Sequence, residues 1–349
     1  MSDTRPILLV LRALGLGDLL TVVPALRALA AAYPTHRRVL ATTAPLAQLA
    51  LRADLADDVL PSRPLAPLAW RWHRPAIAVD LHGSGPESHR VLLDTHPARL
   101  IAFRHPVVPQ SWDGPAWRDD EHEVRRWCRL LDESGVPADP SRLGIVLPPR
   151  PVPAEAIGAT ILHPGAASAA RRWPFERWAD VALAESLDGR VVLITGNAAE
   201  RPLACAVARR AGLRPAAVLA GRTDVLALAG IVRHAARVVC GDTGVAHLAT
   251  ALRTPSVVLF GPTPPAAWGP PTYRPWHRVL WSGSAGDRHG NTPDPGLLRI
   301  TVEDVLGALA DLPAATPWWG RDPRAAPPRP PSFLDVLPAS SSSTTKADG

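Results

Sequence analysis

The stretch Val238-Val239-Cys240-Gly241-Asp242-Thr243-Gly244-Val245-Ala246-His247-Leu248-Ala249 holds an apolar run, a turn at Gly241 and the start of a helical pattern. Asp242 or Thr243 can cap that helix through a side-chain oxygen. The free N–H groups of the first turn lie at the positive end of the helix dipole, which suits a phosphate. His247 falls on the first turns of the same helix. An ordinary capped helix with a buried histidine explains the local pattern equally well.

The same succession of apolar run, turn and helical pattern recurs along the chain. Short, continuous apolar runs are typical of parallel strands covered on both faces. Strands are predicted at 7–11, 38–42, 77–83, 160–162, 191–195, 217–219 and 256–260, and helices at 19–29, 46–51, 124–135, 174–187, 200–211, 225–234 and 302–312. The pattern predicts an α/β fold, with segment 263–297, rich in Pro, Gly and Trp, as a long loop near the cleft.

The length and the proline distribution predict two domains. A chain of 349 residues exceeds the usual size of about 100–200 residues per domain. The Pro-rich segment 149–153 is a semi-rigid linker between domain 1–148 and domain 154–312. Residues 313–349, rich in Pro, Ser and Thr, are predicted to be disordered.

Composition limits the classes of partner. The net charge of +6 comes from 38 basic residues, of which only Lys346 is lysine, and no Arg block tracks nucleic acid. Cys128, Cys205 and Cys240 are isolated, which indicates a reducing compartment and neither a disulfide framework nor a zinc site. Charges and glycines interrupt the apolar segment 7–32, so a soluble, cytoplasmic protein is expected.

The first predicted turn places a carboxylate at the edge of the sheet. Gly15 and Gly17 allow close backbone approach, but a dinucleotide fingerprint would need a third glycine where Leu20 stands. Asp18 lies where a strand hands over to a helix, the edge at which α/β sheets bind ligands, although it could equally be a simple N-cap. After the 77–83 strand, Asp80 and His82 are candidates for an acceptor pocket, with a capped turn as the slightly favoured alternative.

The second half offers two anion-binding loops on one sheet edge. Segment 163–174 joins a Gly turn to adjacent arginines at a helix start, the groups that a diphosphate needs. The candidate diphosphate contacts are Arg171, Arg172, Thr243 and Gly244. A third strand ends in candidates for nucleoside binding, for which a capped loop is the equal alternative: Thr195, Gly196, Asn197 and Glu200.

Taken together, these residues resemble glycosyltransferase family 9, the heptosyltransferases. The resemblance covers most of residues 5–312 and rests on Gly17-Asp18, His163-Pro164-Gly165, Arg171-Arg172-Trp173-Pro174, Ile194-Thr195-Gly196, Gly241-Asp242-Thr243-Gly244 with His247, and Phe260-Gly261-Pro262-Thr263. It implies a GT-B fold, in which two Rossmann-like domains with parallel sheets face each other across a cleft and the last helix, 302–312, crosses back to the first domain. It also implies an inverting transfer that requires no metal or cofactor, with ADP-heptose as the expected donor in lipopolysaccharide core biosynthesis.

The resemblance assigns roles by position. Asp18 would be the general base for the acceptor hydroxyl, and Arg171 would face the donor phosphates where the family usually has lysine. Thr243 and Gly244 would supply N–H groups to the diphosphate, Asp242 would contact the donor sugar, and His247 would support that loop. The chain departs from the family at Ala167, where a hydroxyl residue is common, and the resemblance makes the adjacent Ser168 the candidate diphosphate contact in its place. The family's nucleoside-binding glutamate has no firm counterpart.

Two other classes of function fit parts of the sequence. The sheet pattern also suits an NAD-dependent oxidoreductase, although the broken fingerprint argues against it. The basic composition also suits a non-catalytic protein that binds nucleic acid or an anionic surface, but such binding needs a clustered patch. The transferase hypothesis is favoured, with no nucleic-acid partner. Its acceptor could be a lipid-linked glycan, another cell-surface polymer or a small metabolite, and a lipid-linked acceptor would bring the protein transiently to the inner membrane face.

Overall fold

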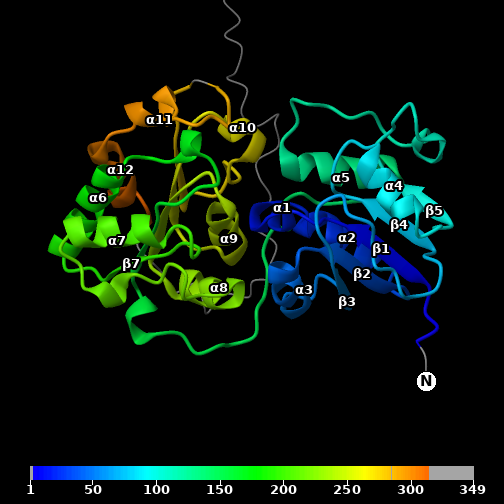
Figure 1. Cartoon of the computed structure of the whole chain (residues 1–349), viewed down its shortest axis with the longest axis horizontal. Coiled ribbons are helices and arrows are strands. Elements are labelled where there is room, and N and C mark those ends of the chain that lie inside the picture. The colour runs from blue at the N-terminus through cyan, green and yellow to red at the C-terminus, as the bar shows by residue number, and fades with distance from the viewer. Residues whose placement is uncertain (1–2, 284, 314–349) are drawn as a thin grey trace, which may run out of the picture.

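Two parallel sheets form the framework of the molecule (Figure 1). The computed structural model describes residues 3–283 and 285–313, so the predicted disordered tail lies outside the described residues except for its first residue. The first sheet has the order β3-β2-β1-β4-β5, with β1 (Ile7–Leu11), β2 (Arg37–Thr42), β3 (Asp58–Pro61), β4 (Ile77–Asp80) and β5 (Arg99–Ile101). The second has the order β10-β9-β8-β6-β7, with β6 (Thr160–His163), β7 (Val192–Ile194), β8 (Arg237–Gly241), β9 (Ser256–Leu259) and β10 (His277–Leu280).

Helices cover both faces of each sheet. Beside the first sheet lie α1 (Leu16–Thr21), α2 (Val23–Ala32), α3 (Ala47–Arg52), α4 (Glu87–Leu93) and α5 (Glu123–Glu133). Beside the second lie α6 (Phe175–Leu187), α7 (Arg201–Arg210), α8 (Val225–His234), α9 (Gly244–Leu252), α10 (Pro265–Trp268), α11 (Pro295–Arg299) and α12 (Val302–Ala310). All five residues of β1 are buried, with Leu8 and Val10 in one hydrophobic cluster and Leu9 in the cluster on the other face. This confirms the predicted parallel strand covered on both sides.

The strand order fixes where each sheet can hold a ligand. In the first sheet the chain leaves the neighbours β1 and β4 in opposite directions, and in the second it does so at β6 and β8. Such a point opens a crevice at the carboxyl ends of the strands, where open α/β sheets bind ligands. The turns after β1, β6 and β8 carry Asp18, the 163–174 loop and Asp242. The fold therefore brings the predicted loops to these crevices.

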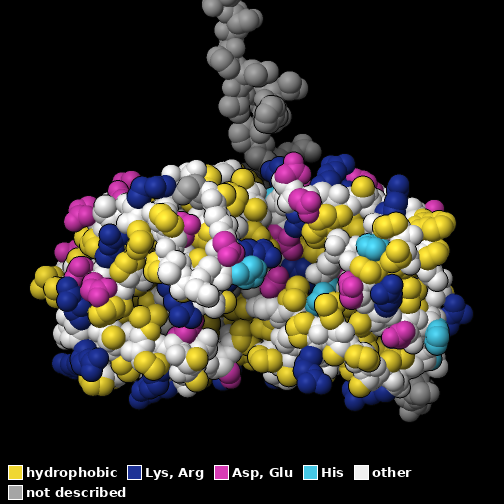
Figure 2. All heavy atoms as spheres, turned by 45° about the horizontal axis from the view of Figure 1, so that its top comes forward, with side chains coloured by type: hydrophobic (Ala, Val, Ile, Leu, Met, Phe, Trp, Pro, Cys, Tyr) yellow, Lys and Arg dark blue, Asp and Glu magenta, His cyan; other side chains and the backbone are white. Residues whose placement is uncertain are grey.

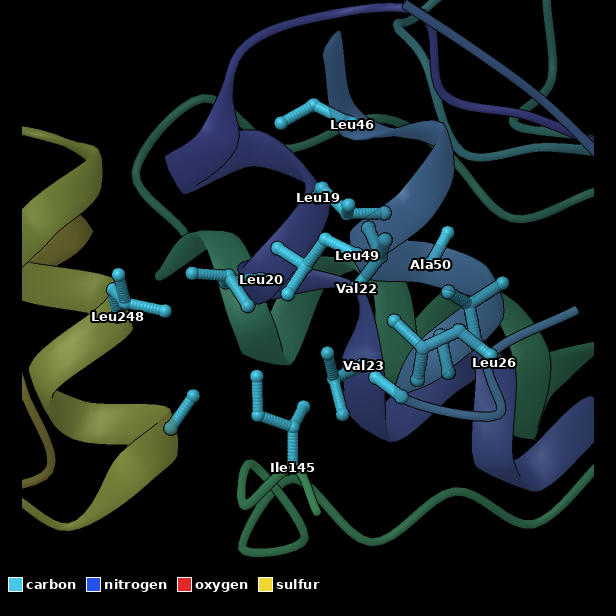
Figure 3. Close-up of a cluster of buried hydrophobic side chains, with 14 of the residues drawn as sticks. Leu19, Leu20, Val22, Val23, Leu26, Leu46, Leu49, Ala50, Ile145 and Leu248 are labelled. Atoms are coloured by element: carbon cyan, nitrogen blue, oxygen red, sulfur yellow. The ribbon is translucent and has the colours of Figure 1, made fainter. Parts of the chain in front are cut away.

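The two halves meet where α1 packs against α9 (Figure 1). Leu248 of α9 shares one hydrophobic cluster with Leu20 of α1 and points toward it (Figure 3). A Cβ at Gly17 would lie 2.8 Å from His247 Cδ2, and a Cβ at Gly244 would lie 2.8 Å from the Cβ of Leu16. Both distances are shorter than side chains tolerate, so the close approach depends on the two glycines.

Four predictions for individual elements differ from the structure. The predicted 19–29 helix is two helices separated at Val22. The 217–219 strand is a single parallel bridge of Val218 to Ile194, because a 3₁₀ turn at Pro215–Ala217 uses the preceding residues. The predicted 263–297 loop contains the edge strand β10, the short helix α10 and the start of α11. The final helix α12 does not cross back over its described length, since it packs on α6, β9 and β10 through apolar residues such as Val305.

Candidate functional site

A cavity of about 690 Å³ lies between the two halves of the molecule. Figure 2 shows a furrow between the halves in which charged and histidine side chains gather. The first half contributes one turn to the cavity, and the second contributes the ends of several strands. The predicted residues that line it are Gly15, Gly17, Asp18, Arg171, Gly196, Asn197, Glu200, Asp242, Thr243, Gly244 and His247.

Two predicted diphosphate contacts are not among the lining residues. The Ser168 hydroxyl donates a hydrogen bond of 2.7 Å to the Arg288 carbonyl. The Nε of Arg172 donates to the Ala166 carbonyl at 2.9 Å. Both side chains therefore hold loops that border the cavity. Neither side chain lines the cavity, where the predicted contact with a diphosphate would have to be made.

Three further predicted site residues, Thr195, Asp80 and His82, do not line the cavity. Thr195 is buried, and its hydroxyl lies 3.0 Å from the Nδ1 of His163, which does line the cavity. Asp80 is fully buried, pairs with His89 at 2.7 Å and accepts a hydrogen bond from the N–H of His82. Asp80 therefore secures the turn after β4, and neither it nor His82 lines the cavity. The capped turn that the sequence also allowed is what the structure shows.

Asp18 faces the cavity from the first turn of α1. Its Oδ2 accepts the N–H of Gly15 at 3.0 Å, and its Oδ1 lies 3.4 Å from the Nη2 of Arg12. The side chain is 29% exposed, so one carboxylate is held in place and still open to a ligand. A carboxylate so placed can accept a proton from a bound hydroxyl.

Asp18 contacts a buried ionic network of Arg12, Glu123 and Arg126, which the sequence analysis did not predict. Arg12 is 1% exposed and donates to the Asp18 carbonyl at 2.9 Å and to Glu123 Oε1 at 2.9 Å. Glu123 also pairs with Arg126 and accepts the indole N–H of Trp127 at 2.8 Å. Burial alone would raise the pKa of Glu123, but these partners hold it below its ordinary value. The network holds Arg12 in place, and Arg12 in turn holds Asp18.

The start of α9 presents unsatisfied donors to the cavity. Thr243 is the N-cap, but neither its side chain nor that of Asp242 makes the predicted capping bond, so that prediction is wrong. The N–H groups of Gly244 and Val245 have no acceptor within the helix. The Thr243 hydroxyl and the Arg171 Nε are buried without a hydrogen-bond partner among the described residues. Buried donors without partners are costly and suit a ligand that is rich in acceptors.

Arg171 joins the two predicted anion-binding loops of the second half. Its Nη1 donates to the Asp242 carbonyl at 3.1 Å and lies 4.0 Å from Asp242 Oδ2. Burial raises the pKa of Asp242 to about 6, although Arg171, Arg288 and a hydrogen bond from Thr263 act against the rise. The carboxyl group of Asp242 therefore keeps its proton to a higher pH than an ordinary aspartate does.

This raised pKa predicts a pH-dependent contribution to stability. A carboxyl group with a higher pKa in the folded state binds more protons there, so its contribution is largest in acid and is lost as the pH rises from about 4 to about 6. We expect the free energy of unfolding of the wild type, relative to Asp242→Asn, to fall over this window by on the order of 1–3 kcal/mol. Urea titrations of both proteins between pH 4 and pH 7 measure this difference. A constant difference over that range would contradict the prediction.

The far end of the cavity is acidic and lies along the sheet edge. Glu200 accepts the N–H of Asn197 at 2.8 Å, and its carboxylate fills the space beside Gly165, where a Cβ would lie 2.2 Å from the carboxyl carbon. Going outward from β8, the order β8-β6-β7 places Gly165 and then Glu200 farther from Asp18. Lining residues at the start of α8, which the sequence analysis missed, continue this end: Thr223, Asp224, Val225 and Leu228. Because ligands bind at the carboxyl ends of parallel strands, these residues could have been predicted from their position after the predicted 217–219 strand.

The unpartnered hydroxyl of Thr243 gives a prediction in which stability and binding diverge. Thr243→Val removes a buried group without a partner, so the free energy of unfolding should stay the same or rise by about 1–2 kcal/mol. If a phosphate oxygen satisfies this hydroxyl, the dissociation constant for pyrophosphate should rise roughly tenfold, as for a lost hydrogen bond to a charged group. Thermal unfolding and calorimetric titration measure the two effects.

A matched control lies on the same helix. The Thr250 hydroxyl donates to the Ala246 carbonyl at 3.0 Å, so Thr250→Val should lower stability and leave pyrophosphate binding unchanged. Equal binding by Thr243→Val and the wild type would exclude the Thr243 hydroxyl as a ligand contact.

Several lining residues come from the segment that was predicted to be a loop near the cleft. Thr263, Trp268, Arg288 and His289 all reach the cavity from that segment. The location of the segment was anticipated, but its aperiodic sequence gave no signal for the individual residues. Within residues 3–283 and 285–313, no cluster of three or more potential metal ligands occurs. No helix in the same part of the chain is long and apolar enough to cross a membrane.

Solved structures of the same fold support this architecture. The Escherichia coli ADP-heptose lipopolysaccharide heptosyltransferase II superposes with a TM-score of 0.69 at 21% identity, over 87% of this chain and 97% of that one. A family 9 glycosyl transferase from Veillonella parvula gives 0.70 at 19% identity, over 88% and 97% of the chains. Together with the two parallel sheets, these likenesses confirm the predicted GT-B fold.

Sequence comparisons identify the family. Lipopolysaccharide heptosyltransferase 3 of Escherichia coli is 29% identical over 161 residues, 44% of this chain and 45% of that protein. Lipopolysaccharide heptosyltransferase 1 of Pseudomonas aeruginosa is 42% identical over 102 residues, 28% and 27% of the two chains. The match therefore spans less than half the length of these relatives. The model for glycosyltransferase family 9 (heptosyltransferase) matches residues 110–287, which is 178 of the 349 residues. The chain belongs to glycosyltransferase family 9.

Proposed function

We propose that the protein is an inverting glycosyltransferase that moves a sugar, a heptose in the favoured version, from a nucleotide-diphosphate donor to a hydroxyl group. One observation carries the proposal. A carboxylate from the first half, Asp18, and the cationic, donor-rich start of α9 with Arg171 from the second half line the same cavity. Sugar transfer from a nucleotide diphosphate needs a base for the nucleophile and fixed positive charge for the leaving group.

In the proposed reaction each half performs one task. Asp18 takes the proton of the acceptor hydroxyl, whose oxygen attacks the anomeric carbon of the sugar. The bond from that carbon to the diphosphate oxygen breaks, and its electron pair leaves with the diphosphate. Arg171 and the N–H groups of Gly244 and Val245 stabilise the developing charge. Attack from the face opposite the leaving group inverts the anomeric centre.

The order of groups along the sheet edge supports an orientation for the donor. The sugar lies next to Asp18 and Asp242, and the diphosphate lies over the start of α9 and Arg171. The nucleoside reaches the acidic end, where Glu200 can accept from ribose hydroxyls and Val225 offers an apolar surface. The heptosyltransferases among the relatives and solved structures, one of them named for ADP-heptose, support ADP-heptose as the donor.

A donor screen tests this proposal. Thermal shift with ADP, UDP, GDP and dTDP, followed by transfer assays with the corresponding sugars, should show selective stabilisation by ADP and sugar transfer from its heptose derivative. Selectivity for UDP or dTDP would change the donor and leave the reaction class intact. Tight binding of NADH with no response to any nucleoside diphosphate would overturn the proposal in favour of the oxidoreductase.

The acceptor and the place of action are further parts of the proposal. The lipopolysaccharide enzymes among the relatives support a glycan acceptor, and we propose a cytoplasmic enzyme that contacts the inner membrane face when this acceptor is lipid-linked. A vesicle co-sedimentation assay with anionic and zwitterionic lipids, with and without acceptor, measures that contact.

A further inference from the structure

Residues 285–290, here called the strap, lie across the loop that carries Arg171. The Ser168 hydroxyl donates to the Arg288 carbonyl at 2.7 Å, and the Ala170 N–H donates to the Gly290 carbonyl at 3.1 Å. On the other side, the Asp294 N–H donates to the Ala170 carbonyl at 3.2 Å. Both edges of residues 168–170 are thus bonded to the segment that contains the strap.

The strap also has a defined turn of its own. The Asp287 side chain accepts the N–H of His289 at 2.9 Å, and the Asp287 carbonyl accepts the N–H of Gly290 at 3.1 Å. A Cβ at Gly290 would lie 3.4 Å from the Cβ of Ala170, so the turn rests closely on the loop below it. These bonds fix the direction in which the strap presents its side chains.

The strap brings a second guanidinium to the cavity. Arg288 and His289 line it together with Arg171 and Asp242. The Nε of Arg288 donates to the Nε2 of His289 at 3.1 Å, and Arg288 takes part in no ion pair within the described residues. Its charge nonetheless reaches the site, since it lowers the pKa of Asp242 alongside Arg171.

In the proposed reaction, the departing diphosphate carries negative charge that Arg171 alone does not neutralise, and the Arg288 guanidinium can balance the remainder. A departing nucleoside diphosphate carries more than one negative charge, whereas Arg171 shares its guanidinium with the Asp242 carbonyl. Arg172, the other predicted contact, bonds the Ala166 carbonyl through its Nε and does not line the cavity. Arginine binds phosphate oxygens in a two-point fashion and keeps its charge at every working pH.

We infer that Arg288 is a second donor-binding arginine, which contacts the diphosphate from the strap, and that Ser168 is the positioning residue that holds the strap in place. This inference rests on the proposed function, because it assumes a diphosphate in the cavity. In this inference the Ser168 hydroxyl acts on the diphosphate indirectly, by holding the strap, and does not make the direct contact expected from the sequence.

Pyrophosphate, ADP and adenosine, titrated calorimetrically, test the inference with Arg288→Gln. We expect the dissociation constants for pyrophosphate and ADP to rise about tenfold or more and that for adenosine to stay within twofold. Arg209→Gln, which removes a charge from the exposed end of α7, is the matched control and should bind all three ligands as the wild type does. Wild-type affinity of Arg288→Gln for pyrophosphate overturns the inference and leaves the proposed function standing. A wild type that binds none of the three ligands overturns both.

A double-mutant cycle separates positioning from direct contact. Ser168→Ala should weaken pyrophosphate binding several-fold in the wild-type background and add no further loss in the Arg288→Gln background. Ser168→Thr, which keeps the hydroxyl, should restore binding. Equal and additive losses in both backgrounds would show that Ser168 contacts the ligand by itself and would overturn its role through the strap.

Discussion

Asp18→Asn is expected to lower the turnover number for sugar transfer about 10²–10⁴-fold, the usual contribution of a positioned general base. The amide keeps an oxygen that can accept the Gly15 N–H, so the turn should keep its shape. It loses the ability to accept the acceptor proton. Single-turnover assays under saturating donor and acceptor measure the chemical step directly.

The same variant should leave the donor half of the site intact. The groups proposed to face the diphosphate come from the second half of the chain, so pyrophosphate and ADP should bind Asp18→Asn with dissociation constants within twofold of the wild type. Asp113→Asn, at an exposed position of the first half, is the matched control for the loss of one carboxylate and should transfer at the normal rate. Normal transfer by Asp18→Asn would show that another group is the base.

Glu123→Ala is expected to lower the free energy of unfolding by about 3–5 kcal/mol, because it leaves buried Arg126 without its carboxylate partner and leaves Arg12 with only the 3.4 Å ion pair to Asp18. Arg12 is 1% exposed and cannot reach water to compensate. The indole N–H of Trp127 also loses its acceptor. Urea denaturation followed by tryptophan fluorescence measures the loss.

Glu133→Ala on the same helix is the control for this large effect. Its carboxylate is 46% exposed and pairs with Arg129 at 3.3 Å, so its removal should cost about 1 kcal/mol or less. If both variants lose the same small amount, the buried network contributes no more than a surface ion pair. Glu123→Gln, which retains an acceptor, is expected to fold and to show slower transfer with unchanged pyrophosphate affinity, since Arg12 also holds the Asp18 carbonyl.

The sequence was most informative where a continuous apolar run met a turn. β1 with Asp18, and β8 with Asp242, were predicted correctly because buried parallel strands have a strong local pattern and their ends must share one sheet edge. β10 was missed because a short edge strand with polar neighbours, in a segment of prolines and tryptophans, has no comparable pattern.

The remaining errors concern contacts between distant segments. Nothing local indicates that Arg12 is buried, since its partner Glu123 lies 111 positions further along the chain. Likewise Ser168 meets the Arg288 carbonyl across 120 positions. Hydroxyl and guanidinium groups in a loop that resembles a phosphate-binding loop predict ligand contacts. Only the three-dimensional structure shows which of these groups already bond to other parts of the protein.

The contact of Gly17 with His247, and of Gly244 with Leu16, has a consequence for recombining the two halves. Each glycine leaves the space that a side chain or the backbone of the other half occupies. A chimera that joins this second half to the first half of a relative must therefore inherit a compatible pair at this boundary, even when every ligand-binding residue is retained. Steric fit at this boundary is therefore expected to limit which first halves can be joined to this second half.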